Sequence, residues 1–241
     1  MAQIYGVNSV FEALRAKARP IERVIIAEGV RHHRLQELVH TARQAGVPVQ
    51  REPRAALDRL TGGANHQGVM AVVAAVRYAD ADELIEKAAA QTIFVLLDGI
   101  EDPHNLGAII RTAECAGAAA VILPERRSAQ LTETVVKTSA GATEYLPIAR
   151  VANLVSFADK LKKHGFWVVG VESSAEKDYA SQDYSGRLAL VFGAEGRGLS
   201  RLLRERCDFV VSVPMGGHIG SLNVSVAVGV VLFEAVRQRR P

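Results

Sequence analysis

The sequence predicts an α/β protein in which a small N-terminal α/β unit precedes a larger domain built on a parallel sheet. From Thr92 onwards, short runs of apolar and β-branched residues alternate with segments whose apolar residues recur at helical spacing. Fully apolar strands separated by helices are typical of parallel sheets that are covered on both faces. Residues 77–91, by contrast, are polar, which suggests a boundary between two domains.

The first 76 residues have the size of a minimal domain and alternate helical and strand patterns. The expected helices cover residues 7–14, 34–45 and 57–60, and the expected strands cover residues 24–27, 47–49 and 68–76. Gly46 follows the second helix, as glycine commonly does at a helix end. We therefore expect a domain over 1–76, a linker over 77–91 whose second half is helical, and a second domain over 92–241.

The second domain reads as a regular α/β alternation. The expected strands are residues 93–97, 120–123, 167–171, 188–192 and 210–213, and the expected helices are residues 106–116, 131–139, 151–164 and 222–238. The last segment is ambiguous locally, because its valines favour a strand whereas its length favours a buried helix. Its length decides the prediction in favour of a helix.

Composition points to an ordinary globular protein, with 49% hydrophobic and 23% charged residues. No apolar run reaches membrane-spanning length and the first residues lack the features of a signal peptide, so no membrane association is expected. The isolated Cys115 and Cys207 form neither a disulfide framework nor a zinc site, so we expect a cytoplasmic protein without a metal.

Charge is unevenly distributed along the chain. Residues 1–76 contain ten Lys and Arg against six Asp and Glu, whereas the remainder contains 19 against 20. A basic excess confined to one domain indicates a polyanionic partner such as RNA, although a solvated basic surface would have the same composition. The arginines that we expect to contact RNA phosphates are Arg15, Arg19, Arg23, Arg31 and Arg34.

Three polar or glycine-rich stretches follow strands of the second domain. The first runs from Asp98 to Glu114, and it places Asn105 near the start of a helix and Arg111 further along it, within reach of the same crevice. The second, residues 193–200, reads Gly-Ala-Glu-Gly-Arg-Gly-Leu-Ser; it matches neither the dinucleotide fingerprint nor the phosphate loop, and Glu195 is not explained by turn geometry. The third, residues 213–225, leads into the final helix.

Each of these polar residues also has a purely structural interpretation. Asn105 could be a helix cap and Arg111 a solvated helix residue. Ser221 is placed to cap the final helix, and Asn223 could be a buried polar residue bonded to backbone. Residue patterns alone leave these alternatives open.

Taken together, the three stretches resemble the motifs of the SpoU/TrmH family of RNA ribose methyltransferases. The matching patterns are D-x-x-x-D-P-x-N-x-G-x-x-x-R-x-A, then G-A-E-G-x-G-L, then P-M-x-G-x-x-x-S-L-N-V-S-x-A, in this order and spacing. The first domain is also similar to the accessory RNA-binding domain of this family, through residues 5–14 and 66–69. The resemblance implies a C-terminal trefoil-knotted (SPOUT) parallel-sheet domain, a small N-terminal RNA-binding domain with a ribosomal-protein-like fold, and a homodimer formed through the last helix.

The resemblance also implies a cofactor and residue roles. The cofactor would be S-adenosyl-L-methionine, and the positions that would bind it are Gly193, Gly196, Val213, Met215 and Leu222. The catalytic positions would be Asn105, Arg111, Glu195, Ser221 and Asn223. A cationic Arg111 would stabilise a developing ribose alkoxide or grip a neighbouring phosphate. The family likeness also suggests a general-base role for this arginine, but an arginine side chain is effectively always protonated, which opposes that role.

The form with an N-terminal domain is similar to bacterial enzymes that methylate a guanosine 2′-hydroxyl in the P loop of 23S rRNA. The expected partner is therefore 23S rRNA, or the assembling large ribosomal subunit. One alternative is a tRNA ribose 2′-O-methyltransferase of the same family. Another, of a different class, is a non-catalytic RNA-binding protein, against which the presence of every motif residue argues.

Overall fold

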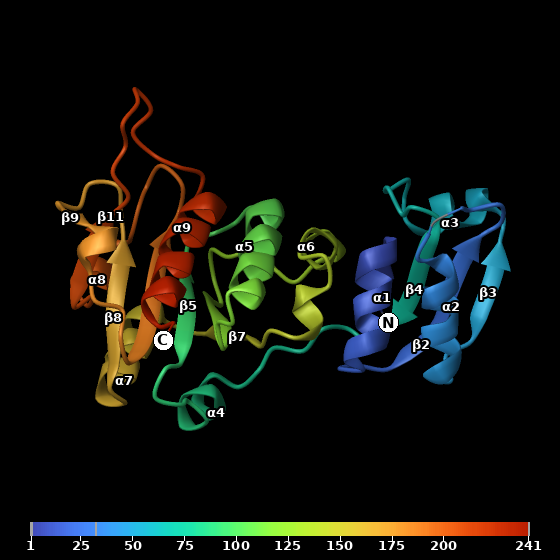
Figure 1. Cartoon of the computed structure of the whole chain (residues 1–241), viewed down its shortest axis with the longest axis horizontal. Helices are drawn as coiled ribbons and strands as arrows, with labels where there is room; N and C mark the ends of the chain where they lie inside the picture. Colours follow the sequence, from blue (N-terminus) through green and yellow to red (C-terminus); the bar gives the residue numbers. More distant parts are fainter. Residues whose placement is uncertain (1, 32, 241) are drawn as a thin grey trace. The chain divides into compact units, whose positions relative to one another are not determined.

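The computed structural model describes residues 2–31 and 33–240, which form two compact units. Unit 1 comprises Met1–Arg77 and Leu131–Tyr145, and unit 2 comprises Tyr78–Gln130 and Leu146–Pro241. Residues 131–145 therefore group with the N-terminal residues, which no sequence pattern indicates. Figure 1 shows the helices and strands of both units.

Unit 1 contains a four-stranded sheet in the order β1-β4-β2-β3. Its elements are β1 (Ala2–Tyr5), α1 (Val7–Ala16), β2 (Ile21–Ala27), α2 (Leu35–Gln44), β3 (Val49–Glu52), α3 (Arg54–Leu60) and β4 (Val69–Val73), with α6 (Glu133–Thr138) and the short 3₁₀ turn η1 (Ala142–Glu144). Strand β4 is antiparallel to both β1 and β2, and β3 is parallel to β2. Strand β1 has no counterpart among the expected elements, because four residues without a β-branched run give almost no local signal.

The core of unit 1 lies between its sheet and helices α1 and α2. Phe11 and Leu14 of α1 and Leu38 of α2 are buried against Val24 and the other core positions of the sheet. Val136 of α6 is part of the same cluster. The segment that follows in the chain is fixed to this unit by a bidentate ion pair between Glu144 and Arg19 (Nη2–Oε1 2.5 Å), with both side chains almost wholly buried.

Unit 2 is a parallel sheet of the order β7-β6-β5-β10-β8-β11-β9. Its elements are α4 (Ala81–Glu86), β5 (Ile93–Asp98), α5 (Pro103–Cys115), β6 (Ala120–Pro124), β7 (Ile148–Val151), α7 (Leu154–Lys163), β8 (Phe166–Val171), β9 (Lys177–Asp178), the 3₁₀ turn η2 (Tyr179–Ser181), β10 (Arg187–Gly193), α8 (Arg201–Arg204), β11 (Phe209–Ser212) and α9 (Val224–Gln238). The predicted α/β class with a parallel sheet is confirmed, and the valine-rich final segment is helical.

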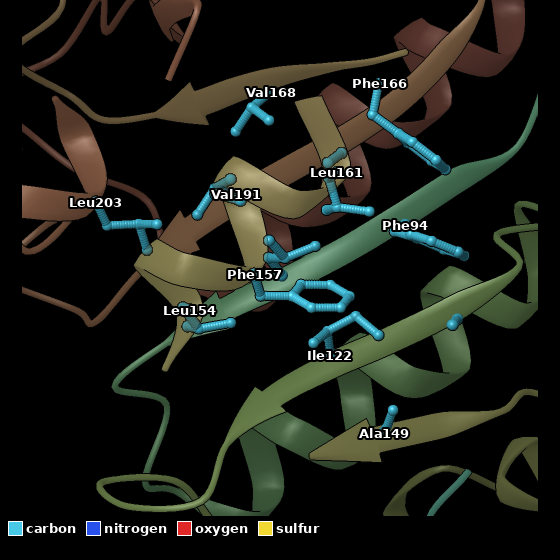
Figure 2. Close-up of a cluster of buried hydrophobic side chains, with 14 of the residues drawn as sticks. Phe94, Ile122, Ala149, Leu154, Phe157, Leu161, Phe166, Val168, Val191 and Leu203 are labelled. Carbon is cyan, nitrogen blue, oxygen red and sulfur yellow. The ribbon is translucent and has the colours of Figure 1, made fainter. Parts of the chain in front are cut away.

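Alternation along the strands sends side chains to opposite faces of this sheet. Phe94 and Ile122 belong to one buried cluster with Phe157 and Leu161 of α7 and Leu203 of α8, which Figure 2 shows in close-up. Helices α5 and α9 pack side by side elsewhere in the unit, as Figure 1 shows. All the strands run in one direction, so the loops that follow them gather at a single edge of the sheet.

Candidate active site

The three motif stretches meet at the carboxyl edge of the unit 2 sheet. The first follows β5 and the second follows the neighbouring strand β10, while the third joins β11 to α9. A direct hydrogen bond ties the first two together, because the Ser200 amide donates to Asp98 Oδ2 (2.8 Å). The two motifs lie about 100 residues apart in the sequence, and the pairing of β5 with β10 brings them together.

The first motif opens helix α5 with strong local signals. Asp102 is the N-cap, its Oδ1 accepting from the His104 amide (2.9 Å), and Pro103 occupies the first helical position. Asn105 lies in the first turn of the helix and is only partly buried. This arrangement excludes Asn105 as the helix cap, so its side chain remains available to the site.

The second motif is a tight turn that depends on glycine. The Ala194 carbonyl accepts hydrogen bonds from the amides of Arg197 and Gly198, and Gly196 has a positive φ of 76°. A Cβ atom on Gly193 would lie 2.1 Å from the backbone carbonyl of Gly198. Strand β10 and the turn after it are therefore in backbone contact, and only glycine permits this.

The third motif places one side chain at the centre of the site. Asn223 is the N-cap of α9, and its Oδ1 accepts from the amide (2.9 Å) and the hydroxyl (2.6 Å) of Ser225. Its Nδ2 donates to Asn105 Oδ1 (3.0 Å) and, at 3.4 Å, to Glu195 Oε2. One amide thus connects all three motifs, using its oxygen for the helix and its nitrogen for the site.

Two cavities adjoin this hydrogen-bonded group. The larger, of about 410 Å³, is lined by Val171–Ser174, Phe192–Gly198, Val213, Met215, Gly220–Leu222, Val224 and Ala227. The smaller, of about 300 Å³, is lined by Gly99–Asp102, Asn105, Ala194, Glu195, Arg197 and Val224. Glu195 and Arg197 line both cavities, so they mark the boundary where groups bound in the two would meet.

The residues predicted from sequence fall into three groups. Gly193, Gly196, Val213, Met215 and Leu222 all line the larger cavity. Asn105, Glu195 and Asn223 are hydrogen-bonded as described. Ser221 lines the larger cavity but does not cap α9; that expectation is wrong, because Asn223 occupies the cap position and its side-chain oxygen accepts from the helix.

Arg111 is the exception. Its side chain is exposed and lines neither cavity, so the expectation that it reaches one crevice with Asn105 is wrong within this chain. The reason is helical geometry: six residues at 100° per residue place it about 120° around the helix from Asn105. Among residues 2–31 and 33–240, the side chain of Arg111 makes no hydrogen bond or ion pair.

Several residues that line the cavities were not singled out from the sequence, among them three polar ones. Glu172 and Ser173 directly follow β8, and Arg197 lies within the second motif. Glu172 Oε2 accepts from Arg204 Nε (2.8 Å). The rule that sites gather after the carboxyl ends of parallel strands would have found Glu172 and Ser173, because β8 is the neighbour of β10.

The candidate RNA contacts of unit 1 need one correction. Arg19 cannot serve as a phosphate contact, since its guanidinium is occupied by Glu144 and by the Ala74 carbonyl (2.7 Å). Arg15 and Arg31 are exposed, and Arg34 lies 4.1 Å from the centroid of the Phe11 ring. Arg23 pairs with its neighbour Glu22. Burial of the ion pair, which net charge does not reveal, separates Arg19 from the other four arginines.

The described residues offer neither a metal-binding cluster nor a membrane-spanning helix. In the part of the chain that the structure describes, no cluster of three or more His, Cys, Asp or Glu side chains could hold a metal ion. Among those same residues, no helix has the length and apolar character needed to span a membrane.

Comparison with known proteins identifies the family. Residues 92–233 match the model of the SpoU rRNA methylase family, and residues 3–79 match the model for RNA 2′-O ribose methyltransferase substrate binding. This chain belongs to the SpoU/TrmH family of RNA methyltransferases. A Bacillus subtilis protein assigned to the TrmH family of tRNA/rRNA methyltransferases (YacO) is 43% identical, over 99% of this chain and 96% of its own length. A Staphylococcus aureus protein of the same family is also 43% identical, over 98% and 96%.

Solved structures of SpoU enzymes share the fold over nearly the whole chain. An AdoMet-bound rRNA methyltransferase from Sinorhizobium meliloti has a TM-score of 0.81 and 28% identity, covering 100% of this chain and 88% of its own. The SpoU methyltransferase AviRb from Streptomyces viridochromogenes, in complex with AdoMet, has a TM-score of 0.82 and 27% identity, covering 98% and 90%. The fold is therefore that of an S-adenosylmethionine-dependent SpoU methyltransferase with an N-terminal substrate-binding domain.

The cofactor of this family is S-adenosylmethionine, and the larger cavity fits such a group. Its volume lies within the range of small-molecule sites, and backbone approaches closely where Gly193, Gly196 and Gly198 lack side chains. Apolar side chains from Phe192, Val213 and Leu222 line it beside polar ones. This mixture suits a ligand that combines a flat base with charged and hydroxyl groups.

Proposed function

We propose that this protein transfers a methyl group from S-adenosylmethionine to the ribose 2′-hydroxyl of a guanosine in the P loop of 23S rRNA. The observation that carries the catalytic part is the Asn223 amide, which joins Asn105 and Glu195 where the two cavities adjoin. The larger cavity would hold the cofactor, and the smaller would hold the target nucleoside. Residues 193, 196, 213, 215 and 222 are the proposed cofactor-binding positions.

The cofactor supplies an electrophilic methyl group at a sulfonium centre. What the protein must add is alignment of the ribose hydroxyl and stabilisation of the charge that develops on its oxygen. Asn105 and Asn223 hold each other in place, and Glu195 accepts from the same amide while lining both cavities. Ser221, exposed at the mouth of the larger cavity, would add a hydroxyl donor or acceptor to the ribose.

Arg111 enters the proposal as a cation that stabilises the alkoxide or grips a neighbouring phosphate. It reaches neither cavity of its own chain, but its helix packs on α9: a Cβ on Gly229 of α9 would lie 3.7 Å from Thr112, the residue after Arg111. Helix α9 carries the exposed apolar side chains Val226 and Phe233. If α9 forms a homodimer interface, Arg111 comes close to the second subunit.

The homodimer is thus part of the proposal, as are the trefoil knot of the C-terminal segment and a cytoplasmic location. An exposed pair of large apolar side chains on one helix favours a buried interface over a solvated one. Light scattering should give the mass of a dimer for the native chain. Phe233→Asp should shift it towards the monomer and reduce methyl transfer, whereas a monomeric native chain would remove this part of the proposal.

The substrate assignment rests on the N-terminal domain. Residues 1–76 would recognise RNA, with 77–91 as linker and 92–241 as the methyltransferase domain. The Sinorhizobium meliloti rRNA methyltransferase and the SpoU methyltransferase AviRb cover nearly all of this chain. The A. aeolicus TrmH/SpoU tRNA modifying enzyme covers 65% of it, with a TM-score of 0.57. This contrast favours rRNA, while the names of the sequence relatives include both substrates.

The test is transfer of a labelled methyl group to large-subunit rRNA from cells that lack the gene, followed by mapping of the modified nucleotide. A single 2′-O-methylguanosine in the P loop would establish reaction and substrate together. Labelling of tRNA alone would replace the substrate and leave the chemistry intact. Labelling of neither would favour a non-catalytic RNA-binding protein.

Arg111→Ala tests the role of the arginine within this assay. We expect methyl transfer to fall by at least about 100-fold, the scale of losing one preorganised charge at a developing oxyanion, while cofactor affinity stays within about twofold. Calorimetric titration with S-adenosylmethionine measures the second quantity. Comparable loss of both would mean that Arg111 supports the structure of α5 and has no role in the chemistry.

A further inference from the structure

A second set of arginines lies at the carboxyl edge, in the loop that follows β6. We call residues 125–129 the arginine loop; it reads Glu-Arg-Arg-Ser-Ala. Strand β6 is the neighbour of β5, so this loop lies next to the first motif. A backbone hydrogen bond joins the two, from the Ala129 amide to the Ile100 carbonyl (2.8 Å).

The arginine loop is held at several points. The Glu125 amide donates to the Val151 carbonyl of β7 (2.9 Å), and the Ser128 hydroxyl donates to the Pro124 carbonyl (2.6 Å). Arg150 of β7 also donates to the Glu125 carbonyl. These bonds hold Arg127 in the left-handed region, at φ 57°, where non-glycine residues are uncommon. The loop therefore has a defined shape in the folded chain.

The two arginine side chains themselves have no role in that shape. Arg126 and Arg127 are both exposed, and within residues 2–31 and 33–240 neither makes a hydrogen bond or an ion pair. Two adjacent cations on a fixed loop, without carboxylate partners, present ten N–H donors to solvent. Such a pair is suited to phosphate oxygens, which accept bidentate bonds from guanidinium groups.

Strand order relates these cations to the candidate active site. Along the carboxyl edge the loops follow the order β10, β5, β6, so Arg197 after β10 lies on one side of the first motif and the arginine loop lies on the other. Neighbouring strands are about 4.8 Å apart, so the ends of β10 and β6 lie roughly 10 Å apart, with the end of β5 and the first motif between them. An RNA strand that crosses the edge would meet cations before and after the target nucleotide.

We propose that Arg126 and Arg127 bind phosphates of the RNA strand next to the target nucleotide, while Arg197 binds on the other side of the cavity. The inference rests on the proposed function, and it adds an RNA-binding surface on the methyltransferase domain itself. Glu101 and Glu125 are also exposed at this edge. Their carboxylates repel phosphate groups that come close to them, so the RNA phosphates should bind at the arginines and not beside these two residues. The RNA must be unpaired at the target to enter the cavity.

The test compares two double variants of the full-length protein. R126Q/R127N removes both charges and keeps the backbone, since asparagine tolerates the left-handed conformation of residue 127. The control, K87A/K163A, removes two exposed positive charges from the amino edge of the same sheet, where α4 and α7 end. A third variant, R126K/R127K, restores the charge without the guanidinium fork.

For R126Q/R127N we expect the KM for RNA to rise about tenfold, with kcat at saturating RNA within about threefold of the native value. The slope of log KM against log salt concentration should fall by about 1.4, the value for two single-strand phosphate contacts. The lysine variant should recover part of the affinity and the full salt slope. Cofactor affinity, measured by calorimetry, should not change in any variant.

The inference is overturned if R126Q/R127N behaves like the control, or if it loses kcat while its KM and salt slope are unchanged. Its failure is distinguishable from failure of the proposed function. If only this inference fails, the native protein methylates RNA and the arginine pair is dispensable. If the proposed function fails, the native protein methylates no RNA. Loss of folding, seen by circular dichroism, would show that the pair is structural and would also overturn the inference.

Discussion

The structural and the catalytic roles of Asn223 can be tested separately, because its side-chain oxygen and nitrogen make different contacts. The oxygen caps α9, while the nitrogen donates to Asn105 and Glu195. Asn223→Asp is isosteric and keeps the capping oxygen, and aspartate is as good a cap as asparagine. A negative charge at a helix N-terminus is also favourable. The helix cap should therefore be preserved, and any loss of stability should be limited to the contacts that Nδ2 makes with Asn105 and Glu195.

The site, by contrast, loses its donor and gains a charge. Loss of the hydrogen bond to Asn105 Oδ1, at 3.0 Å, costs about 1 kcal/mol. A carboxylate oxygen 3.4 Å from Glu195 Oε2 adds about 1–2 kcal/mol of repulsion, taking a high effective dielectric because Glu195 is exposed. The total of roughly 2–3 kcal/mol predicts a 30- to 150-fold fall in kcat/KM.

Asn153 is the matched control. It caps α7 in the same way, its Oδ1 accepting from the amides of Val155 (2.7 Å) and Ser156 (3.2 Å), and it lines neither cavity of the site. Asn153→Asp should leave both thermal stability and methyl transfer unchanged. The reasoning is refuted if Asn223→Asp retains kcat/KM within about threefold, or if the two variants lose activity equally.

Three further predictions follow from buried groups and close contacts. Arg19→Met should lower the free energy of unfolding by roughly 3–5 kcal/mol, because it leaves the buried Glu144 carboxylate unpaired; R19M/E144L should recover much of it in urea titrations, and no recovery would contradict the role of the pair. Gly193→Ala should reduce cofactor affinity at least about tenfold by calorimetry, since its Cβ would strike backbone at 2.1 Å; native affinity would contradict this. At pH 8 a thiol reagent should modify the exposed Cys115 and spare Cys207 until the protein unfolds, because burial raises the pKa of Cys207 to about 12; rapid reaction of two thiols in the native protein would argue against it.

Much of the fold was predictable because its signals are local. The apolar runs of β5, β6, β8 and β10 and the helical periods between them were visible in the sequence, and they imply a parallel sheet. The helix expected over 106–116 is α5, but it begins three residues earlier, because Asp102 caps it and Pro103 occupies its first position. What local patterns missed were elements defined by pairing, such as β1, whose partner β4 lies more than 60 residues away.

For the candidate site, too, the sequence predicted the residues but not the contacts between them. Motif order and spacing singled out Asn105, Glu195 and Asn223, but not the hydrogen bonds between them. Spacing along a helix also suggested that Arg111 would join Asn105, whereas the 120° difference in direction separates them.

By itself, the sequence determined the class of fold, the family and the loops that carry the chemistry, because periodicity, glycine placement and ordered motifs are properties of neighbouring residues. Only the tertiary structure decided which oxygen caps α9, which arginine is buried against Glu144, and which strands place their loops side by side. The physical reason is that hydrogen bonds, ion pairs and sheet order join residues distant in sequence, and their geometry is set when the chain packs.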